Sequence, residues 1–257
     1  MPTFVRPIPF LAALAFATLA STAWADDCRH SEPRSLDEDL ASADLVVIEA
    51  RAGKLEVVGV DGDIVRADGK ACASSRRLLE AIDLRAERAG GTLRIVVDTP
   101  DTGWRGSARL GLRVDVPRDV AVQIFDSSGD IVARDLRLER LDDSSGSARL
   151  SNLDASLIEI SDSSGDLDVR DVEGSLRLAD SSGSIRVENV SGSVIVTDDS
   201  SGDIVLRRIG GDAVVENDSS GGIVAEDVAG DFRVLNDGSG GIRHADVSGR
   251  VELPADD

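Results

Sequence analysis

Repeated aspartates are the residues of this chain whose type and spacing could do chemistry. Six of them begin the same four residues, Asp-Ser-Ser-Gly: Asp126, Asp143, Asp162, Asp180, Asp199 and Asp218. Asp237-Gly238-Ser239-Gly240 closes the series with one substitution, and successive aspartates lie 17 to 19 residues apart. Because carboxylate and hydroxyl oxygens are the ligands that Ca²⁺ prefers, stacked copies of this unit could bind divalent cations.

Two interpretations of the repeated unit stay open. In the first, Asp and Ser accept hydrogen bonds from amides of their own turn and Gly supplies a positive φ. In the second, stacked carboxylates, which repel by about 0.9 kcal/mol at 4.8 Å even in water, hold Ca²⁺ weakly; the candidate ligands are Asp162, Asp180, Asp199 and Asp218. The rest of each period lacks the Gly-Gly-x-Gly-x-Asp unit of a calcium roll. We therefore expect turn chemistry, and no cofactor beyond weakly held Ca²⁺.

Catalytic patterns are missing from the sequence. The repeated serines are equivalent, no Gly-x-Ser-x-Gly elbow occurs, and His30 and His244 lie near opposite ends of the chain. A glycosidase on such a scaffold needs a distinct pair of carboxyl groups and a sugar-stacking surface. Beyond residue 25 the aromatic residues are Trp104, Phe125 and Phe232, with no Tyr. We expect no enzyme activity and no catalytic residue.

The period near 19 residues predicts a stacked array. Each period also holds an apolar residue followed two positions later by Gly, as in Val190/Gly192, so one coil has two turns. Between the turns lie short alternating runs such as Ile185-Arg186-Val187, which is typical of strands. The predicted fold is all-β: a single-stranded β-solenoid of the β-helix or β-roll type, with two short strands per coil. A sandwich of hairpins also alternates, but it does not predict a register kept over six periods.

This fold assigns inward and corner positions. One wall should be lined by Ile131, Leu167, Ile185, Ile204, Ile223 and Ile242, and the other by Leu176, Val194, Ala213, Phe232 and Val251. The structural glycines of the turns should be Gly129, Gly146, Gly165, Gly183, Gly202, Gly221 and Gly240. In residues 157–160 the alternation slips, which predicts a β-bulge or a locally shifted strand there.

Residues 44–257 are predicted to form the solenoid domain, with regular repeats over 125–257. The part up to about residue 124 is irregular and should cap the array, whose end would otherwise expose sheet edges. In it we expect a first strand from residue 45, an imperfect opening coil over 53–57 and 62–65, and a short helix over 76–81 capped by Ser74 or Ser75. A hairpin over 82–97 and a strand over 110–116 follow.

The chain starts with the features of a secretory signal peptide. Arg6 precedes an apolar run, and Ala23-Trp24-Ala25 ahead of Asp26 is a small-x-small cleavage signal, so residues 1–25 should be removed between Ala25 and Asp26. Residues 26–43 form a polar lead-in. The apolar run is too short for a retained anchor, and the rest of the sequence contains no long uncharged stretch, so we expect no membrane insertion. The protein should be exported, to the periplasm, the cell surface or the medium.

The mature chain is strongly acidic. Loss of residues 1–25 removes Arg6 and no acid, which leaves 27 basic against 48 acidic residues and a formal charge of −21. Such a charge argues against nucleic acid and anionic membrane surfaces as partners and favours a soluble monomer.

The two cysteines, Cys28 and Cys72, both lie in the exported part, where thiols are oxidised. A disulfide between them would close a loop of about 45 residues and stabilise the fold by about 4 kcal/mol on the loop-entropy model. Free thiols or a metal site are the alternatives, although neither histidine stands at zinc-ligand spacing from the cysteines.

The repeats also carry a resemblance. Val114-Asp115-Val116-Pro117, Val120-Ala121-Val122 and Asp126-Ser127-Ser128-Gly129-Asp130-Ile131, followed by Ser-Ser-Gly coils with Val-x-Gly turns, resemble the bacterial DUF4097 family of adhesin-like proteins. The likeness covers roughly residue 44 onward. It implies a β-solenoid exported to the cell envelope and supplies no catalytic residues.

Two hypotheses of function follow. The first is a non-enzymatic envelope solenoid that binds an unknown protein or surface partner in the manner of an adhesin, or serves as a structural scaffold. The second is a periplasmic accessory scaffold of the envelope-stress response. A weakly Ca²⁺-binding repeat protein is a further alternative, and localisation separates the first two.

Overall fold

The computed structural model describes residues 28–103 and 106–255. The predicted signal peptide with its cleavage site at Ala25 and Asp26, and the loop residue Trp104, lie outside the described residues. Over the two described ranges, no helix is both long and apolar enough to cross a membrane.

The described ranges form nineteen strands and one short helix. In chain order these are β1 (His30–Asp39), β2 (Leu45–Glu49), β3 (Leu55–Val60), β4 (Ile64–Ala73), α1 (Arg76–Glu80), β5 (Asp83–Ala89), β6 (Thr92–Asp98), β7 (Ala108–Pro117), β8 (Ala121–Asp126), β9 (Ile131–Asp143), β10 (Ala148–Asp162), β11 (Leu167–Asp180), β12 (Ile185–Val190), β13 (Val194–Asp199), β14 (Ile204–Ile209), β15 (Ala213–Asp218), β16 (Ile223–Val228), β17 (Phe232–Asp237), β18 (Ile242–Val247) and β19 (Val251–Glu252).

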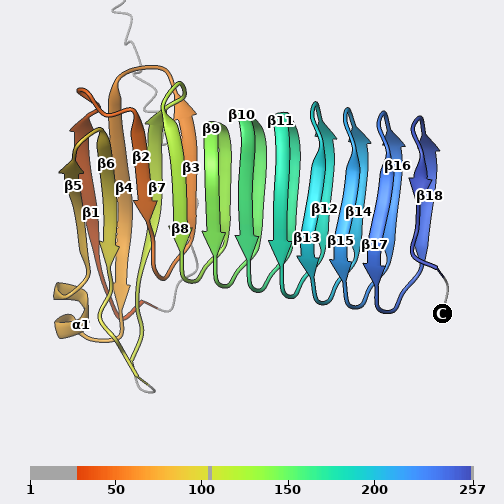
Figure 1. The fold of residues 1–257 in the computed structure, drawn as a ribbon. Helices are drawn as coiled ribbons and strands as arrows, with labels where there is room; N and C mark the ends of the chain where they lie inside the picture. The colour runs from red at the N-terminus through yellow and green to blue at the C-terminus, as the bar shows by residue number, and fades with distance from the viewer. Residues whose placement is uncertain (1–27, 104–105, 256–257) are drawn as a thin grey trace, which may run out of the picture.

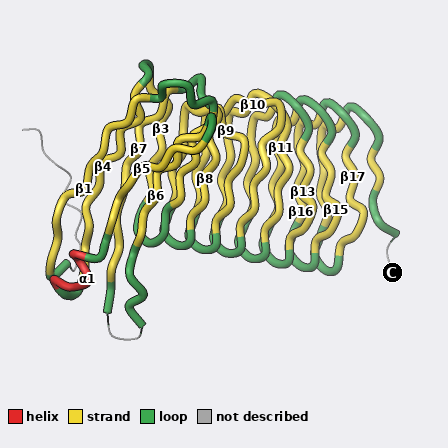
Figure 2. The backbone as a smooth tube through the Cα atoms, turned by 60° about the vertical axis from the view of Figure 1, so that its left-hand side comes forward, coloured by secondary structure: helices red, strands yellow, loops and turns green. Residues whose placement is uncertain are grey.

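The strands stack as a β-solenoid, as the repeat predicts (Figure 1). One wall runs β5–β6–β2–β8, continues through the second halves of β9, β10 and β11, and ends with β13, β15, β17 and β19. The opposite wall runs β1–β4–β7–β3, continues through the first halves of β9, β10 and β11, and ends with β12, β14, β16 and β18. Figure 2 shows the turns of successive coils in rows along opposite edges.

The first coil of the chain is not the first coil of the array. β2 pairs in parallel with both β6 and β8, and β3 with both β7 and β9. The β2–β3 coil therefore lies between the β6–β7 coil and the β8–β9 coil, which the chain adds on either side of it. At this end of the array β1 pairs antiparallel with β4 on one wall, and β5 pairs antiparallel with β6 on the other.

Two N-terminal expectations need correction. Residues 62–65 do not belong to the opening coil, because Ile64 and Val65 begin β4, which runs antiparallel to β7. The polar lead-in holds a ten-residue strand, β1, which pairs with β4 along its whole length. Backbone pairing with β4 and the hydrogen bonds from the Arg34 side chain to the carbonyls of Leu79 and Ile82 hold β1 there, since apart from Leu36 its side chains contribute little to the core.

Other N-terminal elements agree with the prediction. The side-chain oxygen of Ser75 accepts a hydrogen bond from the amide of Leu78 at 3.3 Å and caps α1. β5 and β6 form the expected hairpin, with Gly90 in its turn at φ +60°. In β10 the parallel register shifts between Asp154 and Leu157, at the start of the stretch where the alternation slips.

The core is a single apolar column between the walls. Inward residues such as Ile185, Ile204 and Val194 are fully buried, each in register with its counterpart in the next coil. Ile242 and Val251 keep this register but are less covered: Ile242 is half-buried and Val251 is 37% exposed. Both lie in the last described coil, which packs against a neighbouring coil on one side.

Candidate functional site

The Asp-Ser-Ser-Gly turn forms hydrogen bonds both within its own coil and with the preceding coil. In the turn that starts at Asp180, Oδ1 accepts a hydrogen bond from the amide of Ser182 at 3.2 Å. The Ser182 hydroxyl donates to the carbonyl of Ser163 in the preceding coil at 3.3 Å. The same two bonds recur in other coils, for example those that start at Asp162 and Asp218. The motif therefore closes one turn and joins it to the preceding turn.

The glycine of each turn lies against the backbone of the preceding coil. The seven predicted turn glycines have φ between +126° and +148°. A Cβ on Gly183 would lie 1.7 Å from the carbonyl oxygen of Gly165, closer than atoms can approach. Glycine is needed here both for its backbone conformation and for the spacing between coils.

The repeated aspartates form a column inside the corner. Each is directly in register with the aspartate of the next coil, from Asp126 through to Asp237. All but Asp237 are buried; Asp199, for example, is 2% exposed. From Asp143 to Asp218, Oδ1 accepts the bond from the turn, while Oδ2 is buried with no hydrogen-bond partner among the described residues.

Burial raises the pKa of these carboxyl groups. Desolvation is the largest cause in each. Neighbouring aspartates of the column add to it in Asp126, Asp162, Asp199 and Asp218. The pKa of Asp126 and of Asp199 rises to about 7 and that of Asp162 to about 6, from 3.8. The pKa values of Asp143, Asp180 and Asp218 are also raised. These six carboxyl groups therefore bind protons at a higher pH than an exposed aspartate does.

The four candidate calcium ligands, Asp162, Asp180, Asp199 and Asp218, all belong to this column. In each, Oδ1 accepts a hydrogen bond from its own turn, so only Oδ2 is left to bind another group. Across the described ranges no group of three or more His, Cys, Asp or Glu side chains is arranged to hold a metal ion. The donor set does not match the six to eight oxygens of a Ca²⁺ site.

The other corner of the coil contains a signal that the sequence reasoning missed. The residue just before the apolar member of each Val-x-Gly turn has a left-handed backbone, with φ near +55°, as in Asp171, Asn189 and Asp227. Asn and Asp tolerate this conformation better than other non-glycine residues. An Asp or Asn at this position in most periods was visible in the sequence, although Arg208 takes the same conformation.

A hollow of about 500 Å³ lies on the outer face where β8, β9 and β10 meet. Its lining includes Phe125, Arg140 and Leu157, and the guanidinium of Arg140 lies 5.8 Å from the centre of the Phe125 ring. Leu157 is 44% exposed. Register shifts leave two consecutive residues facing outward in each of two neighbouring strands, Glu139 and Arg140 in β9 and Ser156 and Leu157 in β10. Phe125 faces outward by the ordinary alternation of β8. Bulges of this kind re-aim side chains at functional sites.

The two cysteines are joined. Cys28 and Cys72 form a disulfide whose Cα atoms are 5.5 Å apart, and it ties the start of the described chain to β4. His30 lies in β1 and His244 in β18, in opposite end regions of the array (Figure 1).

Comparison with known proteins gives one family. The model of the Toastrack family, DUF4097, matches residues 74–257. No curated protein matches the sequence.

Solved structures that match share little sequence with this chain. A "putative adhesin" from Bacteroides fragilis is 13% identical over 87% of this chain and 97% of its own, with a TM-score of 0.44. A "putative lipid binding protein" from Parabacteroides distasonis is 15% identical over the same shares, with a TM-score of 0.40. A "putative cell adhesion protein" from Clostridium sporogenes is 11% identical over 86% of this chain and 99% of its own, with a TM-score of 0.32.

Proposed function

The chain belongs to the Toastrack family, DUF4097, and from this premise we propose that it is an exported, non-enzymatic binding scaffold of the cell envelope that holds a partner on its outer face in the manner of an adhesin. The sequence supports export through residues 1–25. The fold supports a scaffold, because stacked coils present long outer faces whose side chains repeat from coil to coil.

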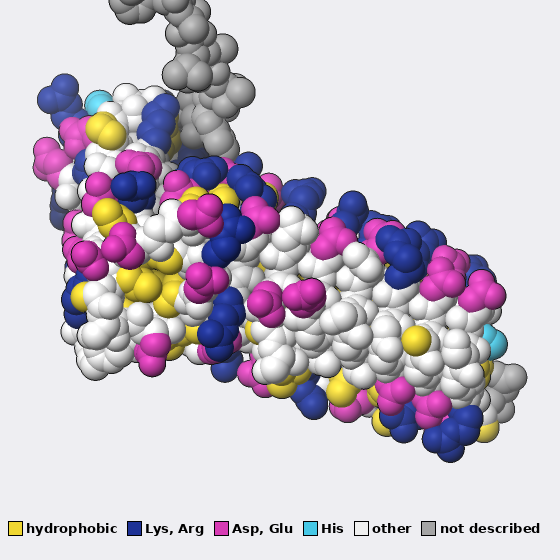
Figure 3. Space-filling view, turned by 90° about the horizontal axis from the view of Figure 1, so that it is seen from above, with side chains coloured by type: hydrophobic (Ala, Val, Ile, Leu, Met, Phe, Trp, Pro, Cys, Tyr) yellow, Lys and Arg dark blue, Asp and Glu magenta, His cyan; other side chains and the backbone are white. Residues whose placement is uncertain are grey.

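The hollow at Phe125 carries the proposal. Lys, Arg, Asp and Glu side chains lie along the flanks of the array, with apolar side chains scattered among them (Figure 3). The hollow differs in that an exposed leucine lies beside a half-exposed phenylalanine, whereas the other described phenylalanine, Phe232, is fully buried. Aromatic and arginine side chains in a hollow are the groups that supply most of the binding energy in protein interfaces. Phe125, Arg140 and Leu157 combine both kinds in one place.

Polar groups surround this apolar centre. Gln123, Ser156, Glu139 and Glu159 line the rest of the hollow and could form hydrogen bonds with a partner. An apolar centre with a polar rim is the usual anatomy of a non-obligate interface. The expected partner is a protein or another surface molecule of the envelope or of a contacted cell.

The first experiment locates the protein. Antibody labelling of intact cells of the producing bacterium should reach it if it acts as an adhesin, whereas recovery from the periplasmic fraction alone would favour an envelope-stress accessory scaffold. Retention in the cytoplasm with an uncleaved N-terminus would refute export altogether.

The second experiment tests the hollow. Purified protein should bind saturably to isolated envelopes or to target cells, and Phe125→Ser with Leu157→Ser should weaken this binding about tenfold or more, since interface anchors contribute 2 kcal/mol or more. Ile195→Ser on β13 is the matched control, because Ile195 is also apolar and half-buried but does not line the hollow. Equal binding by the double variant and the wild type would refute the assignment.

A further inference from the structure

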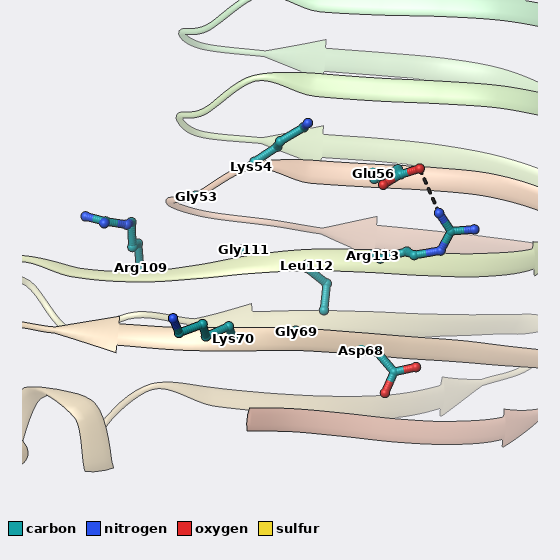
Figure 4. A pocket seen from close by; sticks show the side chains of 10 residues that line it. All are labelled: Gly53, Lys54, Glu56, Asp68, Gly69, Lys70, Arg109, Gly111, Leu112 and Arg113. Carbon is teal, nitrogen blue, oxygen red and sulfur yellow. Dashed lines mark hydrogen bonds and ion pairs between the residues drawn. The ribbon is translucent and has the colours of Figure 1, made fainter. Parts of the chain in front are cut away.

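The two ends of the array differ, and the N-terminal end is closed. There β1 and β5 end the two walls, and Arg88 of β5 pairs with Glu38 of β1 at 3.0 Å across that end. β1 also carries Pro33 and several charged side chains, which protect the edge of a sheet against further pairing. Behind β1, Arg113 of β7 pairs with Glu56 of β3 at 2.7 Å (Figure 4). Charged side chains thus link both the strands and the walls of this end.

The C-terminal end is open. Among the described residues β18 pairs with β16 and β19 with β17, and each has no strand on its other edge (Figure 1). The carbonyl of Gly241 accepts a hydrogen bond from the amide of Ile223 in the preceding coil. Because alternate residues of a strand direct their backbone groups to the same side, the amides and carbonyls of Ile242 and His244 point away from the array. Such an edge can pair with a further strand.

Apolar side chains are exposed at the same end. Four large apolar side chains are exposed in the described ranges, and three of them lie in the last two coils: Leu235 at 52%, Val251 at 37% and Leu253 at 43%. One coil earlier, the counterpart of Val251 is Phe232, which is fully buried. His244 is in register with the buried Ala225 and lies 6.1 Å from the Phe232 ring, but is itself exposed. A further layer of strands would cover these side chains, as each coil covers the one before it.

A second copy of this chain fits the open end. Over residues 242–255, Arg243 and Arg250 balance Asp246 and Glu252, so the charge that favours a monomer in a chain of net −20 is absent from this coil. Stacking on the N-terminal end of another copy is blocked there by the closed edges of β1 and β5. The remaining arrangement joins two C-terminal ends about a two-fold axis, and it closes at two copies.

The two-fold axis pairs β18 antiparallel with β18 of the other copy. Asp246 has a left-handed backbone, with φ +53°, so regular alternation is confined to residues 242–245. Directly opposed residues of an antiparallel pair face the same side, so the axis passes through Arg243 or His244, near the middle of that stretch. At Arg243 it would place like charges opposite each other, which is destabilising. At His244 the two copies exchange both backbone hydrogen bonds of that residue, with Cα atoms about 5.5 Å apart.

We propose that the protein forms a two-fold dimer through its C-terminal end, with β18 of the two copies paired at His244. Strands of six residues and walls about 10 Å apart give an end of roughly 20 by 20 Å with its outward side chains, or about 800 Å² buried in total. This is less than the roughly 1,200 Å² of stable interfaces, so the dimer should be weak and reversible. It carries two Phe125 hollows, and two linked sites bind a surface that displays many partners more tightly than one does.

A cysteine at the axis tests the register. The two cysteines of the chain are paired with each other, so His244→Cys supplies one free thiol per copy. Across the axis the two thiols lie at the Cα separation of a disulfide, about 5.5 Å, and oxidation should cross-link the dimer. Ala245→Cys is the control, because one residue from the axis its two copies are about 8 Å apart, beyond the reach of a disulfide. Equal cross-linking of the two variants, or none of His244→Cys, would refute the pairing.

Sedimentation velocity measures the association itself. Between about 1 and about 500 µM the wild type should shift from one chain to two by mass action. Val251→Ser with Leu253→Ser removes two apolar side chains from the interface and should weaken dimerisation about tenfold or more. Leu157→Ser, which removes a similarly exposed leucine from β10, should change it less than twofold. Circular dichroism checks that each variant is folded.

Three outcomes would overturn the proposal. The first is a single chain at every concentration. The second is a mass that grows beyond two chains, because a filament requires the C-terminal end to stack on the N-terminal end. The third is dimerisation of the Val251 and Leu253 double variant equal to wild type, which would place the interface elsewhere. None of these outcomes bears on the Phe125 hollow, whose partner binding is measured separately with the Phe125 and Leu157 variants.

Discussion

Replacing Asp199 by asparagine should stabilise the fold at neutral and higher pH. Asparagine has nearly the same shape and keeps an oxygen for the bond from the amide of Ser201. It also places an uncharged amide where the buried Oδ2 of Asp199 has no partner. Burial, with Asp218 and Asp180 on either side, raises the pKa of Asp199 to about 7, so at pH 8 the fold holds a carboxylate that the unfolded chain exposes to water.

The magnitude follows from the shift. Each unit of pKa corresponds to about 1.4 kcal/mol, so moving from 3.8 to about 7 corresponds to at most about 4 kcal/mol at pH 8. The folded state binds more protons than the unfolded state, so the free energy of unfolding falls as pH rises from 3.8 to about 7 and levels off above that. At about pH 5 the same relation gives less than half of the full penalty, and the protein is still above its isoelectric point of about 4.4.

The assay is urea unfolding followed by circular dichroism at about pH 5 and about pH 8. Asp199→Asn should raise the urea midpoint clearly at the higher pH and less at the lower one. Asp198→Asn is the control, because Asp198 is the exposed neighbour and loses the same charge. A gain that is equal at both pH values, or a gain no larger than that of the control, would refute the argument that the buried carboxyl is ionised at a cost.

Three further perturbations test other parts of the fold. Gly183→Ala should destabilise by about 3 kcal/mol or more, because its Cβ meets the backbone of Gly165, whereas Gly62→Ala, with a similar φ but nothing within 4 Å, should cost about 1 kcal/mol; equal melting temperatures would contradict the close-approach argument. Under oxidising conditions Cys72→Ser should lower the free energy of unfolding in urea by about 4 kcal/mol relative to the wild type, and with dithiothreitol the two proteins should have the same urea midpoint. A midpoint unchanged by the substitution under oxidising conditions would show that the disulfide does not constrain the unfolded chain. Ca²⁺ and NaCl at matched ionic strength should raise the melting temperature alike through screening, and calorimetric uptake of one Ca²⁺ per pair of coils would contradict this.

The repeat was the most predictable part of the structure. The spacing of the Asp-Ser-Ser-Gly units is enough to predict the coils, because parallel stacking demands the same residue at the same height in each coil. The slip in alternation at residues 157–160 marks a real register shift in β10. The hollow beside this register shift could not be predicted from residues 157–160 alone, because its lining also includes Phe125 and Arg140 from other coils.

The burial of the aspartates was harder to predict. Strict alternation from Val194 and Val196 would place Asp199 outward, but two consecutive outward residues, Thr197 and Asp198, precede it and reverse the parity. The N-terminal part was harder still. The position of the β2–β3 coil between two later coils depends on parallel partners distant in sequence. β1 is held by backbone pairing and by polar side-chain bonds, which leave no apolar pattern in the sequence.

The aspartate column shows why a solenoid keeps a residue that costs it stability. Aliphatic ladders alone do not distinguish the correct stacking of two similar coils from one displaced by two residues, since either buries Val or Ile against Val or Ile. A displaced Asp199 would lose the amide of Ser201 and would face the apolar column without a hydrogen bond. The second serine of the turn makes the same distinction, because its hydroxyl, as in Ser182, donates to a carbonyl of the preceding coil only when the two turns are level. Burying the carboxyl groups thus lowers the stability of the fold, but it disfavours displaced registers more strongly than the correct one. A single register keeps the outer faces of the array in order.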